Sequence, residues 1–318
     1  MALLTTTVGS FPKPPALHEA RRRHAEGEID AAALREVENE AVRRALALQE
    51  SLGIHLLVDG EMDRTDPIAT FAEHLAGVEI DGWVRVYGDR YVRKPRIAGP
   101  LGRTASTTLD RYRFASDAAS GAVKAILPGP YSLMDGSFDH HYGSRREACL
   151  AFAEIVREEC AELAAAGALD IQLDEPSAGA RPEEMELLHE ALARATAPVS
   201  GRARVWVYLG YADLAALGPD LAALPAEGLI VAGAHSGYEG LEAFARALPA
   251  GRFAAVGVVD VVEPRVETEG EIGDRLARIA DLVPRDRLWA VPDGGLRALR
   301  PETARAKVTA MCAAARSA

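Results

Sequence analysis

Eight short apolar runs recur along the chain, and segments with helical spacing separate them. Each run is nearly continuous in apolar residues, without strict apolar–polar alternation, which is typical of parallel strands buried on both faces. The pattern therefore predicts parallel strands that alternate with helices. The eight runs cover residues 3–10, 54–61, 122–130, 169–176, 204–211, 228–235, 253–260 and 288–295.

Two of the intervening segments carry the clearest helix signals. In 30–53, Asp30 stands where a cap is needed, apolar residues recur at helical spacing and Gly53 closes the segment. In 144–167, Ser144 is followed three residues later by a glutamate, and a glycine ends the segment. This alternation predicts an α/β fold, a (β/α)₈ TIM barrel, in a single domain over residues 1–318. A doubly wound open sheet is the alternative, weakened because no GxGxxG motif follows the first run.

One segment interrupts the alternation of strands and helices. Residues 82–100 alternate apolar and polar side chains on both sides of the dipeptide Gly88-Asp89. This pattern predicts a β-hairpin excursion between the second and third barrel strands.

Composition restricts the partners and the compartment. The formal net charge of −11 argues against nucleic acid or an anionic membrane as partner, because both require clustered lysine and arginine. Three cysteines without a CxxC motif favour a reducing, cytoplasmic location. We therefore expect a cytoplasmic enzyme with a small-molecule substrate; whether it forms a homo-oligomer stays open.

Polar residues concentrate where the predicted strands end. In a barrel these ends converge on one mouth, which is where barrel enzymes place their chemistry. A single acid at a strand end is more often a helix cap or turn former, but the set together favours a functional pocket. The set comprises Gly9, Ser10, Asp59, Glu61, Arg64, Asp66, Asp174, Glu175, Tyr208, Tyr211, Asp213, His235, Ser236, Asp260, Glu263, Arg265 and Asp293.

The residues alone do not indicate a transition-metal site. Zinc requires three or four cysteine, histidine or carboxylate ligands at suitable spacing, whereas the cysteines here lie in predicted helices. A carboxylate-only Mg²⁺ site remains as an alternative, with oxygen ligands from Asp174, Glu175, Asp260 and Asp293.

Six motifs in order resemble those of one family. They are "TTTVGSFPKP", "LLVDGEMDRTD", "PGPYSL", "IQLDEPS", "VVDVVEPRVET" and "LWAVPDGGL", spread from about residue 5 to residue 300. Together they resemble the catalytic C-terminal barrel of cobalamin-independent methionine synthase and its short stand-alone relatives. The resemblance implies a methyltransferase barrel with a folate or corrinoid methyl donor.

The resemblance also implies a place for the substrate. In the family, the "GS" of the first motif and the glutamate of the second bind the two ends of homocysteine, and the aspartate of "DEP" holds its amine. These positions are Gly9, Ser10, Glu61 and Asp174 here, and Arg64 is grouped with them. Backbone N–H groups and a hydroxyl suit a carboxylate, and acids suit an ammonium group.

The family's zinc ligands are replaced. Tyr208 and Gly210 stand at the positions of the His-x-Cys pair, Gly233 at that of the glutamate and Gly294 at that of the last cysteine. The family's proton-donating histidine is replaced by Val262. A free thiol is mostly protonated at neutral pH, so losing zinc is a severe change for transfer to a thiol. The sequence therefore predicts a site without a metal.

Three hypotheses about function follow. The first is an enzyme that kept the amino-acid-binding half of the site and performs methyl or alkyl transfer, or a lyase or decarboxylase reaction, without zinc. The second is a true homocysteine methyltransferase whose ligands lie elsewhere, and the third is a non-catalytic binding protein. For the first hypothesis, Tyr208 and His235 are the candidate catalytic groups, and Asp260 and Asp293 orient them.

Overall fold

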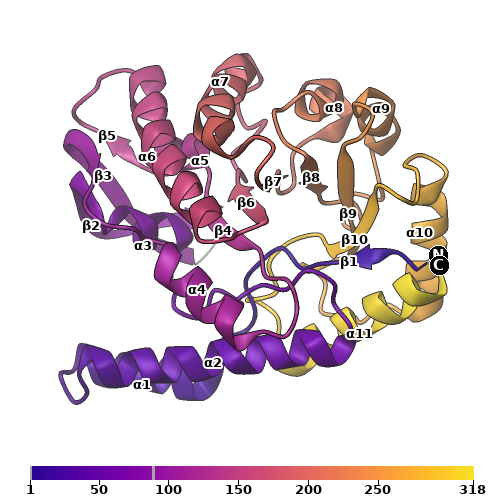
Figure 1. Ribbon diagram of the computed structural model, residues 1–318, viewed down its shortest axis with the longest axis horizontal. Helices are drawn as coiled ribbons and strands as arrows, with labels where there is room; N and C mark the ends of the chain where they lie inside the picture. The colour runs from indigo at the N-terminus through magenta and orange to yellow at the C-terminus, as the bar shows by residue number, and fades with distance from the viewer. Residues whose placement is uncertain (1, 88–89) are drawn as a thin grey trace.

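The computed structural model describes residues 2–87 and 90–318, and these form a parallel barrel surrounded by helices (Figure 1). Seven strands are hydrogen-bonded in the order β1-β10-β9-β8-β7-β6-β4, and all of their pairings are parallel. These strands are β1 (Leu4–Thr5), β4 (Ala125–Pro128), β6 (Asp170–Asp174), β7 (Arg204–Tyr208), β8 (Gly228–Val231), β9 (Phe253–Val259) and β10 (Leu288–Pro292).

The second strand position closes the ring. Leu56 forms a parallel bridge with Thr6, and Leu57 forms one with Val123, so residues 56–57 lie between β1 and β4. All eight apolar runs of the sequence therefore occupy barrel positions, and the prediction of an α/β barrel is confirmed. The second run differs in pairing through isolated bridges, because the backbone N–H and carbonyl of Val58, which follows them, bond to the Gln49 side chain.

Helices cover the outside of the barrel. They are α1 (Pro15–Ala25), α2 (Ala31–Leu52), α3 (Pro67–Ala72), α4 (Leu109–Ala118), α5 (Pro130–Asp135), α6 (Arg145–Ala165), α7 (Met185–Thr196), α8 (Leu214–Ala222), α9 (Leu241–Ala247), α10 (Glu269–Ala280) and α11 (Pro301–Ser317), with single turns η1 (Pro182–Glu184) and η2 (Ala197–Val199). No helix within the described ranges has both the length and the apolar character to cross a membrane.

The two helices predicted in detail begin as their caps require. The Asp30 side chain accepts a hydrogen bond from the backbone N–H of Ala33 at 2.8 Å, and Gly53 ends α2 in the left-handed region. The Ser144 hydroxyl accepts one from the N–H of Glu147 at 3.3 Å at the start of α6. Local sequence thus determines where these helices start.

The excursion between the second and third barrel positions is an antiparallel hairpin. It consists of β2 (Leu75–Tyr87) and β3 (Arg90–Arg103), and the short β5 (Phe138–Asp139) adds to β3. The predicted hairpin is confirmed, and its strands extend beyond the alternating segment 82–100. The dipeptide 88–89, at the expected turn, lies outside the described residues.

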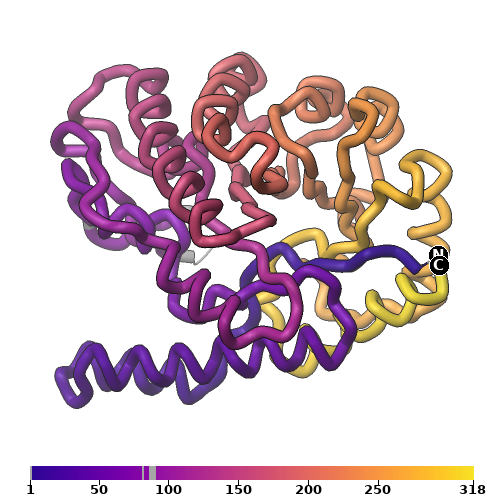
Figure 2. The backbone as a smooth tube through the Cα atoms, in the orientation of Figure 1, coloured from indigo at the N-terminus to yellow at the C-terminus, as the bar shows by residue number. Residues whose placement is uncertain are grey.

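Two apolar regions hold the fold together. The larger one lies between strands and helices, and the smaller one fills the barrel interior, where Trp206, Trp289 and Val291 are buried. The chain ends meet at one side of the barrel, where the backbone N–H of Leu3 donates to the carbonyl of Ala315 at 2.9 Å (Figure 2). The barrel interior is therefore filled by side chains, and the two chain ends are tied to each other.

Candidate active site

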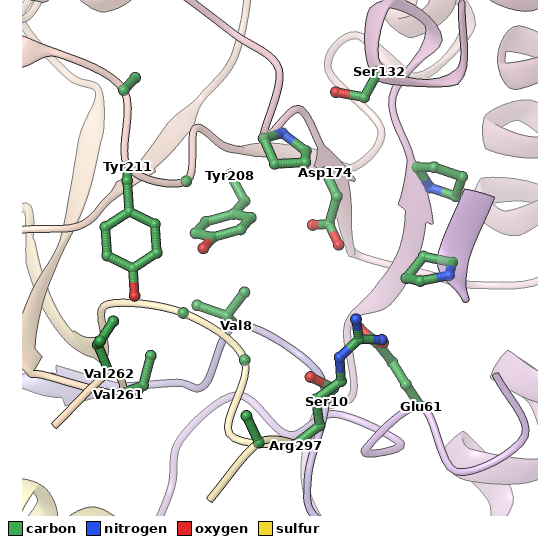
Figure 3. Close-up of a pocket in the computed structure, with 18 of the residues that line it drawn as sticks. Val8, Ser10, Glu61, Ser132, Asp174, Tyr208, Tyr211, Val261, Val262 and Arg297 are labelled. Carbon is green, nitrogen blue, oxygen red and sulfur yellow. The ribbon is translucent and has the colours of Figure 1, made fainter. Parts of the chain in front are cut away.

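A cavity of about 1220 Å³ opens at the carboxyl ends of the barrel strands. Its wall includes Ser10, Glu61, Asp174 and Tyr208, which come from four different strand ends. Figure 3 shows these side chains around one space, with Tyr211 on the side of Tyr208 that faces away from Glu61. These four strand ends therefore meet at one cavity.

Glu61 is held in an unusual backbone conformation at one end of the cavity. Its φ of 53° lies in the left-handed region, which a non-glycine residue adopts only when its surroundings impose it. The Lys13 ammonium donates to the Glu61 carbonyl at 2.7 Å, and the Glu61 carboxylate lies so close to Gly9 that a Cβ there would come within 2.4 Å of it. Gly9 therefore acts by leaving room for this carboxylate.

Asp174 is the second acid at this end. The side-chain amide of Gln172 donates to its carboxylate at 2.6 Å, and to the carbonyl of Val8 at 2.7 Å. Burial, and then the charge of Glu61, raise the pKa of Asp174 to about 7. The two acids therefore share negative charge in a buried place, which favours a bound cationic group.

A buried lysine beneath these acids was not selected from the sequence. Lys124 is 2 % exposed, and its ammonium donates to the carbonyl of Thr7 at 2.7 Å. Burial lowers the pKa of Lys124 to about 7, while Asp174, Asp170 and Glu61 counteract the shift. A lone lysine inside the apolar run 122–130 was the available signal.

Arg64 lies behind the wall of this cavity. Its guanidinium donates to the carbonyl of Ile126 at 2.7 Å, and its side chain is 8 % exposed. It therefore supports the segment that carries Glu61, and its position gives no support to the predicted substrate contact. Arg297, which the sequence reasoning did not select, lines the cavity instead.

The candidate catalytic residues are divided between the cavity and the layer behind it. Tyr208 lines the cavity, and its hydroxyl donates to the carbonyl of Asp293 at 3.2 Å. The Asp293 carboxylate is fully buried and accepts from the N–H groups of Gly233, Ala234 and His235 at 2.7–3.0 Å. Asp293 therefore ties the end of β10 to the loop after β8, which is an orienting position.

His235 and Asp260 form a pair beside the cavity. The Nδ1 of His235 lies 2.9 Å from an Asp260 carboxylate oxygen, and the His235 ring meets the edge of the Tyr211 ring at 5.9 Å. The predicted orientation of His235 by Asp260 agrees with this contact. Because neither residue is among those lining the cavity, an acid–base role for His235 stays a prediction.

The His235–Asp260 contact has a titration consequence. The hydrogen bond and charge of Asp260 raise the pKa of His235, so its charged form stabilises the folded state. This stabilisation is present below the unfolded pKa of histidine and is lost as the pH rises through the folded value. We expect an NMR titration of the imidazole to give a pKa above 6.5, and the Asp260→Asn variant to lower it. An unchanged titration in that variant would contradict the pairing.

The resemblance places the family's zinc ligands at four positions of this chain, and the residues at those positions do not fit the ion. Gly210, Gly233 and Gly294 supply no donor atom, and a Cβ on Gly233 would come within 2.6 Å of the Tyr238 ring. Tyr208 would have to lose its proton to ligate a metal, yet burial raises its pKa well above the usual value.

The alternative carboxylate site is not formed either. Glu175 accepts from the N–H groups of Tyr131 and Ser132, whereas Asp260 and Asp293 have the separate partners given above. Among the residues that the structure describes, no three His, Cys, Asp or Glu side chains are grouped to hold a metal ion. The Mg²⁺ grouping considered from the sequence is therefore not present in this part of the chain.

The structure thus defines an α/β barrel with a large cavity at the carboxyl ends of its strands. The sequence profile of the family described as "Cobalamin-independent synthase, Catalytic domain" matches residues 3–317, and the chain belongs to this family.

Named relatives agree with the family. A methionine synthase of Sulfurisphaera tokodaii is 32 % identical over 298 residues, which are 93 % of this chain and 87 % of that protein. A 5-methyltetrahydropteroyltriglutamate–homocysteine methyltransferase of Aeromonas salmonicida is also 32 % identical over 93 % of this chain, but the match spans only 40 % of that longer protein. The chain is thus a methyltransferase-like enzyme.

A solved relative supports the fold. The B12-independent methionine synthase from Shewanella sp. W3-18-1, in complex with selenomethionine, superimposes with a TM-score of 0.86 at 27 % identity. The superposition covers 99 % of this chain and 97 % of that one.

Proposed function

We propose that this protein transfers a methyl or related alkyl group to a small α-amino acid and does so without zinc. The observation that carries the proposal is the division of one cavity into two halves. Ser10, Glu61 and Asp174 line one end, whereas the other end has Tyr208 and Gly294 in place of metal-ligating side chains. The substrate-binding half is therefore kept where the metal-binding half is changed.

The binding half suits an amino acid. Asp174 and Glu61 place two acids where an ammonium group gains most from charge-assisted hydrogen bonds, and Ser10 offers a hydroxyl to the carboxylate. The solved relative from Shewanella was crystallised with selenomethionine, which is an α-amino acid. Both facts support an amino-acid substrate in this half.

The cavity has room for a second reactant. Ligand pockets for drug-sized molecules occupy roughly 300–1,000 Å³, and this cavity of about 1220 Å³ exceeds that range. An amino acid and a methyl donor can therefore be bound side by side, as the transfer requires.

We also place the reaction in the cytosol, because all three cysteines are buried free thiols.

In the changed half of the cavity, Tyr208 acts as a hydrogen-bond donor. During transfer the bond between the donor and the methyl group breaks, the methyl group bonds to the acceptor atom of the amino acid, and the proton of that atom replaces the methyl group on the donor. Negative charge develops on the acceptor atom as its proton leaves, and in the family a metal compensates this charge. Because Tyr208 stays protonated, its hydroxyl can donate a hydrogen bond to that atom. His235 and Asp260 support this end through Tyr211, whose ring His235 contacts.

Turnover tests the proposal directly. The purified protein is incubated with L-homocysteine and, in separate reactions, with methyltetrahydropteroylglutamate, a methylcorrinoid and a methylsulfonium compound, and the methylated amino acid is quantified. Methylation by any donor in the presence of a zinc chelator supports the proposal. Turnover that stops with the chelator and returns with zinc favours a true zinc-dependent methionine synthase, and amino-acid binding without turnover favours a binding protein.

We expect the purified protein to carry less than one zinc ion per chain. Three of the four ligand positions are glycine, and the fourth is a tyrosine that holds its proton. Elemental analysis after dialysis against a chelator checks this expectation. About one zinc per chain retained after dialysis would show that ligands come from other residues.

A further inference from the structure

Two tyrosine hydroxyls converge beside Gly294 at the changed end of the cavity. A Cβ placed on Gly294 would lie 3.1 Å from the hydroxyl of Tyr208 and 3.5 Å from that of Tyr211. Both tyrosines line the cavity, on the side away from Glu61 (Figure 3). The missing side chain at 294 is therefore what exposes the two hydroxyls to a common ligand atom.

Both hydroxyls act as donors. Burial raises the pKa of Tyr208 and of Tyr211, and the charge of Asp293 adds to both shifts. Neither phenol is ionised near neutral pH. The Tyr208 hydroxyl donates to the Asp293 carbonyl at 3.2 Å and exchanges this long bond for one to the ligand, whereas the Tyr211 hydroxyl has no hydrogen-bond partner within the described residues.

We infer that Tyr208 and Tyr211 form a two-donor site that selects an amino acid whose side chain ends in a neutral hydrogen-bond acceptor, with Tyr211 as a specificity-determining residue. The inference rests on the proposed function, because it takes the ammonium end to be bound by Asp174 and Glu61. It adds the kind of atom that ends the side chain of the same substrate.

A neutral acceptor fits the charges better than an anion. Asp293 and Asp260 lie behind the tyrosines, and Asp174 lies beside Tyr208 on the neighbouring strand, in register with it. The hydrogen-bonding capacity of Asp293 is already taken up by three backbone N–H groups, but its charge still repels another carboxylate. A thiol sulfur or an amide oxygen meets no such repulsion.

The spacing calls for a short side chain. Asp174 and Tyr208 are paired residues of β6 and β7, and neighbouring strands lie about 4.8 Å apart. The acid and the tyrosine therefore lie at adjacent strand ends, and we choose probes whose side chains have two or three carbons. L-Homocysteine and L-glutamine both meet this condition, and L-norvaline is similar in length but lacks the acceptor.

Calorimetric binding to the full chain tests the inference with four probes: L-homocysteine, L-glutamine, L-norvaline and L-glutamate. We expect the wild type to bind one of the two neutral-acceptor probes at least about tenfold more tightly than L-norvaline, and more tightly than L-glutamate. Which of the two binds tells a thiol from an amide. Tyr211→Phe is expected to reduce the preference over L-norvaline by roughly tenfold, through weaker binding of the acceptor probe alone. Tyr91→Phe, on the exposed hairpin, is the matched control and should leave all affinities unchanged.

Gly294→Ala provides a second variant that leaves both tyrosine side chains in place. Its Cβ would crowd the Tyr208 hydroxyl and come into ordinary contact with that of Tyr211, which limits the approach of a ligand atom to both. Affinity for the acceptor probe should therefore fall while affinity for L-norvaline is kept. Gly270→Ala, where a Cβ meets open space on α10, controls for the added methyl group. An unchanged preference in Tyr211→Phe, or tightest binding of L-glutamate, overturns the inference and leaves the proposed function standing. Failure of the wild type to bind any of the four amino acids overturns both.

Discussion

Replacing Asp174 by asparagine is expected to lower kcat/KM for an amino-acid substrate by roughly 30-fold or more, because removing one partner of a buried charge pair costs about 2–5 kcal/mol. Asparagine keeps the shape of the side chain and can still accept the hydrogen bond that Gln172 donates at 2.6 Å. The loss then reports the charge that binds the substrate ammonium group.

The same variant should remove a pH dependence of binding. Because the pKa of Asp174 is raised to about 7, its carboxyl is neutral below that pH and ionised above it. Affinity for an ammonium-bearing substrate should therefore rise as the pH increases through the neutral range in the wild type. In Asp174→Asn, the affinity should no longer follow this titration. Calorimetric titrations with L-homocysteine or L-glutamine at a series of pH values measure both.

Stability should change in the opposite direction. Between the unfolded pKa of about 4 and the folded value of about 7, the unfolded chain releases the Asp174 proton while the folded chain retains it. Wild-type stability therefore falls as the pH rises through this window, and Asp174→Asn removes that loss. Denaturant unfolding at neutral pH should show a variant at least as stable as the wild type.

The matched control is Asp110→Asn, because the Asp110 side chain is 99 % exposed and lies away from the cavity. It should leave kcat/KM and its pH profile unchanged. If Asp174→Asn binds substrate with wild-type affinity across the pH range, Asp174 does not hold the ammonium group.

The barrel was predictable because its signals are local. Each parallel strand is buried on both faces and therefore reads as a continuous apolar run, and caps such as Asp30 and Ser144 mark helix starts within a few residues. The second run shows the limit of this reasoning. An apolar run predicts burial, but pairing depends on the partners of the backbone, and here the N–H and carbonyl of Val58, directly after the bridges, bond to the Gln49 side chain.

The site was predictable at the level of strand ends but not of individual contacts. Ser10, Glu61, Asp174 and Tyr208 all line the cavity, whereas His235, Asp260 and Asp293 lie behind it. The side chain of Asp293 turns to three N–H groups of the loop after β8, and this depends on two segments that are far apart in sequence. The sequence places Tyr211 at a strand end, but only the fold shows that its hydroxyl and that of Tyr208 both lie beside Gly294.

Tyr208→Phe is the second variant with a large expected effect. Removing a single preorganised donor at the reacting atom lowers turnover by about 10²- to 10³-fold, within the range of about 10²- to 10⁴-fold that applies to acid–base groups. The phenylalanine ring keeps the packing of the barrel interior, where Tyr208 belongs to the same cluster as Trp206 and Val291. The measurement is kcat with the donor that supports wild-type turnover.

Loss of the hydrogen bond that Tyr208 makes in the folded state cannot account for a decrease in kcat of this size. The Tyr208 hydroxyl meets the Asp293 carbonyl at 3.2 Å, and a bond of this kind contributes about 1 kcal/mol to stability. A small decrease in the free energy of unfolding is therefore expected beside the large decrease in kcat. Tyr91→Phe controls for the loss of a phenol hydroxyl on the exposed hairpin. Normal kcat in Tyr208→Phe would show that the reacting atom is stabilised by another group, and the cavity between Asp174 and Gly294 would then need a different chemistry from the one proposed.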